Sequence, residues 1–214
     1  MFKRLYIGYE RGVIMKKQNK KNGVMDIVFL LDRSGSMSGM ESDTIGGYNS
    51  YLNSMRSKNV KVTTVLFDNE YEMITKRENI DTVKAMTDDI YYTRGSTALL
   101  DAIGSTIRYM DKETTNKVLF VITTDGEENS SKEYSKKQIK ELILGHSNWE
   151  FIYIGANIDS YSEASSIGIR HDRTSNYNKS KKGMEKLFSS ISKVSMCYEE
   201  DGCIASDWNK ELDN

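Results

Sequence analysis

Apolar and polar positions follow two alternating patterns along the chain from Met25 onward. Near-continuous apolar runs, typical of strands buried on both faces of a parallel sheet, cover Met25–Leu31, Val60–Phe67, Val118–Thr123 and Phe151–Ile154. Between these runs, apolar residues recur at helical spacing, which predicts helices over Thr44–Met55, Leu99–Met110, Lys136–Leu144, Tyr161–Ser166 and Lys181–Val194. The alternation predicts an α/β fold of three layers, with a mostly parallel central sheet and helices on both faces.

One further strand, Tyr71–Thr75, follows the Val60–Phe67 run so closely that no crossover helix fits between them. A turn at Asn69 therefore makes this strand an antiparallel edge of the sheet. No sequence period of roughly 20–50 residues repeats, and no internal linker divides the chain. We accordingly expect one domain over residues 23–196, a flexible N-terminal extension over 1–22 and a polar C-terminal tail over 197–214.

The N-terminal extension raises a hypothesis about where the polypeptide begins. Residues 10–12, Glu-Arg-Gly, can be encoded by a purine-rich stretch that resembles a bacterial ribosome-binding site, and Met15 follows at a suitable spacing. We therefore hypothesise that translation begins naturally at Met15. The alternative is a native extension, either flexible or containing an edge strand at residues 5–7.

The charge balance argues against several classes of partner. The chain has 30 Lys and Arg against 31 Asp and Glu, a formal net charge of −1 at pH 7, which disfavours binding to nucleic acid through many phosphates or to a membrane through a polybasic segment. Its apolar runs are strand-sized and no signal-peptide pattern occurs. We expect a cytoplasmic protein, monomeric alone, with Cys197 and Cys203 as reduced thiols; a disulfide between them is the alternative.

Three loops beside predicted strands and helices combine short oxygen-bearing side chains with glycine. They cover residues 32–39, 94–98 and 123–129, and the first and third directly follow apolar strands. Carboxyl ends of parallel strands meet at one edge of a sheet, where open α/β folds place their ligand sites. The chain has no proline but 15 glycines, and glycine permits tight turns and close backbone approach. Four glycines lie in these loops: Gly35, Gly39, Gly95 and Gly126.

Two carboxylates and three hydroxyls in these loops form a donor set suited to a hard divalent cation, Mg²⁺ or Mn²⁺. The five residues are Asp32, Ser34, Ser36, Thr97 and Asp125. Because hydroxyls are neutral and weak ligands, a metal that they hold keeps a positive charge that is not neutralised. Such a site is expected to capture an anionic oxygen from a partner.

The same five residues resemble the metal-ion-dependent adhesion site of von Willebrand factor A domains: Asp32-x-Ser34-x-Ser36, then Thr97, then Asp125-Gly126. The resemblance covers essentially the whole predicted domain and implies that family's Rossmann-like fold. It implies that Ser34, Ser36 and Thr97 contact the metal directly. It implies further that Asp32 and Asp125 act mostly through bound waters, and that a protein partner supplies a Glu or Asp carboxylate to the metal. The short chain looks most like the small single-domain members of bacteria and their phages.

Each piece of the motif also has a purely structural interpretation. An Asp at the end of a strand, such as Asp32 or Asp125, is commonly a helix or turn cap, and Ser or Thr at 96–97 before a helix is commonly an N-cap. Glu127 and Glu128 are interpreted either as first-turn acids of the next helix or as rim charges that repel unsuitable partners.

Residues beside the loops are likewise open to two interpretations. Tyr91-Tyr92 forms either part of the core or a hydrophobic rim of the site. The run Lys179–Lys182 is predicted to be the solvated start of a helix rather than a nucleic-acid patch. Three other side chains are either partner contacts or solvated loop residues: Arg33, Met37 and Arg94.

Three functions follow from this site. The leading hypothesis is a non-enzymatic, divalent-metal-dependent protein-binding module, because no pair of nucleophile and base is recognisable. A second is a regulatory subunit of an AAA+ ATPase or of a stress- or phage-related complex, as the resemblance to bacterial members suggests; it differs only in the partner. A third is a metal-dependent, phosphatase-like α/β enzyme that begins with an Asp after its first strand. That enzyme needs a second Asp two residues further on, where this chain has Ser34.

Overall fold

The structure, a computed structural model, describes residues 23–156 and 159–212. Within them lies a six-stranded sheet of order β3-β2-β1-β4-β5-β6, in which only β2 and β3 pair antiparallel. The strands are β1 (Met25–Asp32), β2 (Val60–Phe67), β3 (Tyr71–Asn79), β4 (Val118–Thr124), β5 (Trp149–Gly155) and β6 (Thr174–Asn176). The α-helices are α1 (Glu41–Ser54), α2 (Leu99–Glu113), α3 (Lys136–Gly145), α4 (Ser160–Ser166) and α5 (Lys181–Asp201). Two short 3-10 helices are η1 (Gly35–Met37) and η2 (His171–Arg173).

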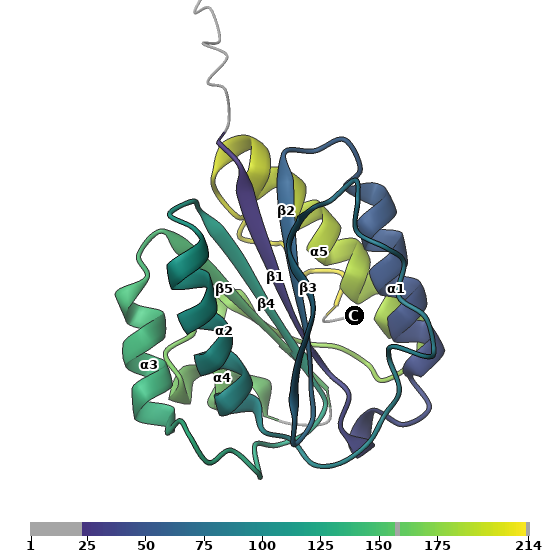
Figure 1. Cartoon of the computed structure of the whole chain (residues 1–214), viewed down its shortest axis with the longest axis vertical. Coiled ribbons are helices and arrows are strands. Elements are labelled where there is room, and N and C mark those ends of the chain that lie inside the picture. The colour runs from purple at the N-terminus through teal and green to yellow at the C-terminus, as the bar shows by residue number, and fades with distance from the viewer. Residues whose placement is uncertain (1–22, 157–158, 213–214) are drawn as a thin grey trace, which may run out of the picture.

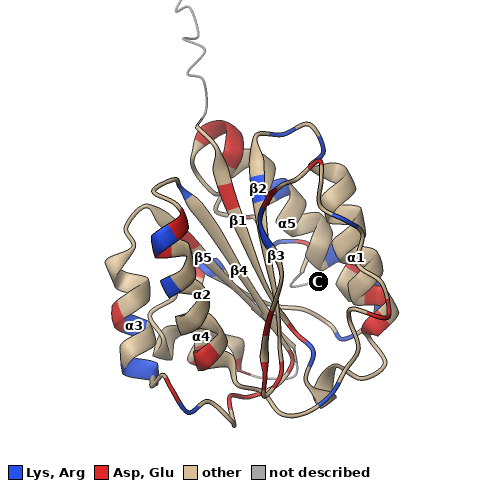
Figure 2. Ribbon diagram, in the orientation of Figure 1, with Lys and Arg blue, Asp and Glu red and all other residues tan. Residues whose placement is uncertain are grey.

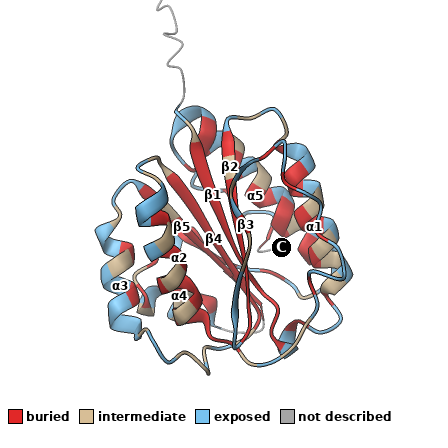
Figure 3. Ribbon diagram, in the orientation of Figure 1, coloured by how far each residue is buried: buried red, intermediate tan, exposed pale blue. Residues whose placement is uncertain are grey.

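Helices cover both faces of the sheet: α1 and α5 lie on one face, and α2, α3 and α4 on the other (Figure 1). Successive residues of a strand point to opposite faces, so β1 contributes to both layers. Ile27 and Phe29 join the core beneath α1 and α5, whereas Val28 and Leu30 join the core beneath α2. All of β1 and β4 is buried (Figure 3). The predicted three-layer α/β fold is confirmed.

Among the α-helices and strands, the sequence pattern missed one strand, and it predicted neither of the two 3-10 helices. β2 has the predicted bounds, and β3 is the expected antiparallel edge, although it continues to Asn79 rather than ending at Thr75. The missed element is β6, a three-residue strand whose sequence Thr-Ser-Asn contains no apolar residue and so lacks a strand pattern. The hypotheses about Met15 and a strand at residues 5–7 lie outside the described residues.

The end of the chain differs from the predicted polar tail. α5 continues beyond Val194 to Asp201, and the segment after it contributes three buried apolar side chains to the core on the α1 side: Ile204, Trp208 and Leu212. These three residues are spaced four apart among polar neighbours, so the segment reads as polar by composition although one side of it is apolar.

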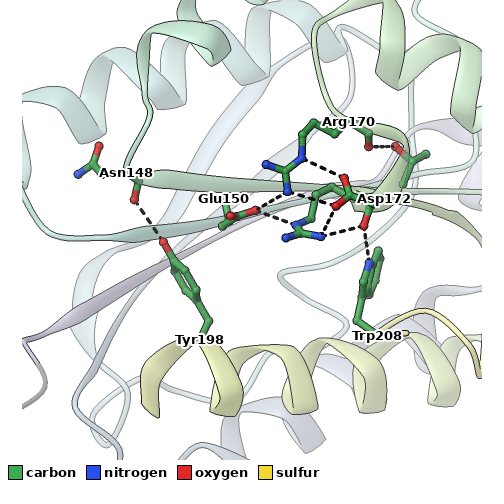
Figure 4. A network of polar contacts seen from close by, with 8 residues as sticks. Asn148, Glu150, Arg170, Asp172, Tyr198 and Trp208 are labelled. Atoms are coloured by element: carbon green, nitrogen blue, oxygen red, sulfur yellow. Dashed lines mark hydrogen bonds and ion pairs between the residues drawn. The ribbon is translucent and has the colours of Figure 1, made fainter. Parts of the chain in front are cut away.

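Hydrogen bonds join this C-terminal region to residues next to β5 and β6, as Figure 4 shows. The hydroxyl of Tyr198 in α5 donates to the carbonyl oxygen of Asn148 at 3.2 Å. Nε1 of Trp208 donates to the carbonyl oxygen of Asp172 at 2.9 Å. The described C-terminal residues are therefore an integral part of the domain.

Charged residues lie mostly in loops, in helices and in the edge strand β3 (Figure 2). An exception is Asp26 near the start of β1, which is fully buried. Its carboxylate accepts hydrogen bonds from Arg77 Nε at 2.8 Å, Thr114 Oγ1 at 2.7 Å and Asn116 Nδ2 at 2.9 Å. These hydrogen bonds join the start of β1 to β3 and to the loop before β4, and they satisfy the buried carboxylate.

Two smaller expectations are also settled within the described residues. Cys197 and Cys203 are both free and exposed, so the structure contains no disulfide between them. No helix in residues 23–156 and 159–212 combines the length and the apolar character that crossing a membrane requires.

Candidate metal site

The carboxyl ends of β1 and β4 bring the two predicted aspartates to one edge of the sheet, at the lower end of the strands in Figure 1. The two strands are parallel neighbours, with Leu31 beside Thr123. Asp32 is the last residue of β1, and Asp125 follows the last residue of β4. Both carboxylates are buried, at 1% and 5% exposure. The parallel pairing therefore produces the proximity that the sequence predicted.

The three predicted hydroxyl ligands converge beside Gly126. A Cβ atom added to Gly126 would lie 2.8 Å from Thr97 Oγ1, 3.0 Å from Ser36 Oγ and 3.7 Å from Ser34 Oγ. The hydroxyls of Ser34 and Ser36 are themselves hydrogen-bonded at 2.9 Å. Any side chain at position 126 would enter the space between these oxygens. Thr97 is not the N-cap of α2, since that position is Ala98 and carries no side-chain cap.

Backbone hydrogen bonds join the three loops. The amide of Gly35 donates to the carbonyl oxygen of Gly95 at 3.0 Å, and the amide of Asn129 to that of Thr97 at 3.0 Å. The Asn129 side chain also accepts from the Thr97 amide at 3.0 Å. Gly95 has φ +67°, and a Cβ there would lie 1.9 Å from Asn69 Oδ1, so only glycine fits this turn. The loops thus form one connected unit.

Both carboxylate oxygens of Asp32 are occupied by hydrogen bonds from the chain. Oδ1 accepts from the Ser34 amide at 2.7 Å, and Oδ2 accepts from Thr124 Oγ1 at 2.5 Å. Burial raises the pKa of this carboxyl from 3.8 to about 6, although the hydrogen bonds from Thr124 and Ser34 oppose the rise and the nearby Asp125 adds to it. Asp32 therefore orients the loop and adds negative charge beneath the hydroxyls.

Asp125 is held very differently. Neither of its buried oxygens accepts a hydrogen bond from the described residues. The ammonium group of Lys179 lies 2.8 Å from Oδ2, at the distance of an ion pair although without hydrogen-bond geometry. Burying a carboxylate without hydrogen bonds is costly, so this group depends on a cation for its stabilisation and has both oxygens free to accept hydrogen bonds or to ligate a metal.

These donors fit a hard divalent cation. The described residues contain no group of three or more His, Cys, Asp or Glu side chains that could hold a metal, so carboxylates alone cannot supply the coordination. Three convergent hydroxyls next to two buried carboxylates supply the oxygen ligands that Mg²⁺ and Mn²⁺ accept. Metal binding by these five residues stays a prediction.

Two flanking residues differ from both of their sequence interpretations, because Arg33 and Met37 are buried and neither contacts solvent to any extent. Arg33 Nε lies 2.8 Å from Asp68 Oδ2 and its Nη1 lies 2.7 Å from Glu72 Oε2, so this side chain ties the first loop to the β2–β3 hairpin. Arg94 also pairs with Asp68, at 2.9 Å, but remains 37% exposed.

Other neighbours of the site divide between core and rim. Tyr91 is fully buried and its hydroxyl donates to the carbonyl oxygen of the last residue of β1 at 2.5 Å, whereas Tyr92 is 45% exposed on the rim. Glu127 and Glu128 do not lie in the first turn of α3. Instead Glu128 accepts from the Leu100 amide at 3.0 Å, at the start of α2.

Sequence reasoning missed three residues that shape the site: Thr124, Asn129 and Lys179. A signal existed for Thr124, a hydroxyl beside the predicted ligand Asp125, and for Asn129, an amide in the same loop. Lys179 had no such signal, because it follows the unrecognised strand β6 and was interpreted as part of a solvated helix start. Only the position of β6 in the sheet brings it to this edge.

The comparisons with known proteins identify the family of the domain. The family model of the von Willebrand factor type A domain matches residues 26–190, which is most of the chain. The chain therefore belongs to the von Willebrand factor type A domain family. A search of curated protein sequences found no significant relative.

Several solved structures share the fold at low sequence identity. The PilB minor pilin from Streptococcus sanguinis has a TM-score of 0.65 and 12% identity, over 85% of this chain and 63% of that one. A von Willebrand factor type A protein from Catenulispora acidiphila has a TM-score of 0.63 and 14% identity, over 82% and 43%. Proximal thread matrix protein 1 from the mussel byssus, with a zinc-occupied metal-ion-dependent adhesion site motif, has a TM-score of 0.57 and 16% identity, over 81% and 46%. The chain spans less than two thirds of each of these proteins.

Proposed function

We propose that this chain is a non-enzymatic protein-binding module that captures an acidic side chain of a partner through a divalent metal ion, Mg²⁺ or Mn²⁺. The observation that carries the proposal is the arrangement around Gly126, where three hydroxyls converge next to a buried Asp125 carboxylate that accepts no hydrogen bond from residues 23–156 and 159–212. Von Willebrand factor A domains commonly engage protein partners, and the mussel protein holds zinc at its corresponding motif. The alternative function, a regulatory subunit of an AAA+ ATPase or of a stress- or phage-related complex, uses the same site and differs only in the partner.

In this proposal each residue has a separate task. Ser34, Ser36 and Thr97 present neutral oxygens to the ion, while Asp32 and Asp125 supply the negative charge around it. The ion, when bound, supplies a positive charge that attracts a Glu or Asp carboxylate from outside. Asp32 is locked by two hydrogen bonds from the chain, which suits a role through bound water, whereas Asp125 has free acceptor capacity.

Isothermal titration calorimetry with Mg²⁺, Mn²⁺ and Zn²⁺ tests the metal site directly. Ser34→Ala removes one converging hydroxyl. We expect it to weaken metal binding on the order of tenfold or more, which corresponds to a loss of about 1.4 kcal/mol in binding free energy. Ser38→Ala is the matched control, because Ser38 lies exposed in the same loop and makes none of these contacts. Equal affinities for the two variants would contradict the assignment of the site.

Affinity capture tests the partner. The wild-type protein, immobilised in Mg²⁺, should retain a protein from a lysate of the source organism that elutes with EDTA. The Ser34→Ala variant should not retain it, whereas Ser38→Ala should. If a partner remains bound in EDTA, or binds Ser34→Ala equally well, recognition does not pass through the metal and the proposed function is wrong.

A further inference from the structure

Lys179 occupies a place that its sequence context did not suggest. Its ammonium group lies 2.8 Å from Asp125 Oδ2 and also donates a hydrogen bond to the carbonyl oxygen of Ser36. Both contacts are with residues of the candidate metal site. The side chain is 24% exposed, so the ammonium reaches the site from its solvent-facing side.

The backbone on either side of Lys179 is anchored. Before it, the Tyr177 amide donates to the Gly155 carbonyl oxygen at 2.9 Å, and the Tyr177 ring is buried. After it, the Ser180 side chain caps α5 by accepting from the Gly183 amide at 3.1 Å. Lys179 therefore extends from anchored backbone, and its contacts with Asp125 and Ser36 hold the ammonium at the site.

A tethered ammonium and a divalent cation cannot both approach Asp125 closely without strong repulsion, because like charges a few ångströms apart repel. We propose that Lys179 is an intramolecular competitor of the metal ion, which holds the Asp125 carboxylate until the ion displaces it and so sets the metal concentration at which the site fills. This inference rests on the proposed metal site, which it deepens by naming the residue that controls its affinity.

The positive charge of Lys179 also acts on a second carboxylate, that of Glu41. It lies at the start of α1, where it accepts hydrogen bonds from Thr93 Oγ1 at 2.6 Å and the Gly39 amide at 2.8 Å. The hydrogen bond from Thr93 chiefly lowers the pKa of this carboxyl, and the positive charge of Lys179 contributes as well. Lys179 thus lies within electrostatic reach of two carboxylates, only one of which belongs to the metal site.

Calorimetric titration of Mg²⁺ into the full chain tests the competition. We expect Lys179→Met to tighten Mg²⁺ binding on the order of tenfold, because the competing charge is gone while the length of the side chain is kept. Lys179→Arg retains the charge and should stay within about threefold of wild type. Lys182→Met removes one charge from an exposed position in the first turn of α5, and should change the affinity by less than about twofold.

Thermal unfolding separates competition from a merely structural role. Lys179→Met leaves a buried carboxylate without its cation, so its Tm in EDTA should fall below that of wild type, while the rise in Tm on adding Mg²⁺ should become larger. A lower Tm in both buffers with unchanged Mg²⁺ affinity would overturn the inference.

The remaining outcomes distinguish this inference from the proposed function. If wild type binds Mg²⁺ and Ser34→Ala does not, the metal site stands, and an unchanged affinity in Lys179→Met overturns the competition alone. If Mg²⁺ binds to Lys179→Met but not to wild type, competition is supported in its strongest form. If neither protein binds Mg²⁺ or Mn²⁺, both proposals fail.

Discussion

At the scale of single residues, three buried aspartates illustrate how the partners of a carboxylate decide whether it has a structural role or can bind a cation. Asp26 accepts hydrogen bonds from three different side chains and is fully partnered. Asp32 is occupied by Ser34 and Thr124 but still has a raised pKa. Asp125 accepts no hydrogen bond among the described residues and has Lys179 as an ion-pair partner. The same residue type thus stabilises the sheet, shapes a loop or is left ready for a cation.

The raised pKa of Asp32 predicts an unusual dependence of stability on pH. Because burial raises this pKa from 3.8 to about 6, the folded protein binds the proton more tightly than the unfolded chain does. The stabilising contribution is complete below the unfolded value of 3.8 and is lost as pH rises through about 6. In EDTA, the free energy of unfolding of wild type minus that of Asp32→Asn should fall by on the order of 2–3 kcal/mol across this window.

Urea unfolding of both proteins in EDTA, from about pH 3.5 to about pH 7 so that the series begins below the unfolded pKa and ends above the folded one, measures this difference. Subtracting the Asp32→Asn curve cancels the titration of the other carboxyl groups. A difference that stays constant, or that grows with pH, would show that the Asp32 carboxyl has no raised pKa in the folded protein.

At the scale of elements, sequence periodicity predicted strands and helices wherever apolar residues repeat. β2 has its predicted bounds. In the last predicted helix, five apolar residues at helical spacing are buried: Met184, Leu187, Phe188, Ile191 and Val194. The motif placed the five site residues at one edge because parallel strands end together there. β6 and Lys179 were beyond prediction, since a polar three-residue strand has no pattern and its position depends on pairing with β5.

Two adjacent glycines of α1 provide a test of how this helix packs. A Cβ on Gly47 would lie 2.2 Å from the Phe188 ring of α5, whereas a Cβ on Gly46 would meet nothing within 4 Å. We expect Gly46→Ala to stabilise the protein by about 0.5–1 kcal/mol, because alanine favours a helix interior over glycine. Gly47→Ala should destabilise it by about 1–3 kcal/mol, because overpacking forces the two helices apart.

Chemical denaturation of these two variants gives the comparison, with each serving as the other's control for helix propensity. Opposite signs are expected from neighbouring positions with the same substitution. Stabilisation by both substitutions would mean that α1 and α5 do not approach each other as closely as the Gly47–Phe188 contact requires.

At the scale of the whole molecule, two cores on opposite faces of one sheet hold the site's loops in place from below. The core beneath α1 and α5 extends from β1 to the C-terminal segment and includes Tyr91, whose hydroxyl donates to the last carbonyl of β1, and Trp208. Residues near the end of the described chain thus belong to the same packed layer as a residue beneath the metal loops. Stability of that layer and geometry of the site are expected to be linked.

The extent of this core is tested at Trp208, which the sequence placed in a polar tail. Its ring is 8% exposed, and its Nε1 donates to the Asp172 carbonyl oxygen at 2.9 Å. We expect Trp208→Ala to destabilise the protein by about 3 kcal/mol or more, as for other large aromatic residues removed from a core. Trp208→Phe keeps most of the apolar contact, so it should cost less, on the order of the hydrogen bond at about 1 kcal/mol.

Leu144→Ala is the control, since Leu144 is a large apolar side chain that is 65% exposed on α3 and should change stability by less than about 0.5 kcal/mol. If urea unfolding instead shows that Trp208→Ala lowers the free energy of unfolding as little as Leu144→Ala does, the segment after α5 is a tail in solution. The core beneath α1 and α5 would then end at α5.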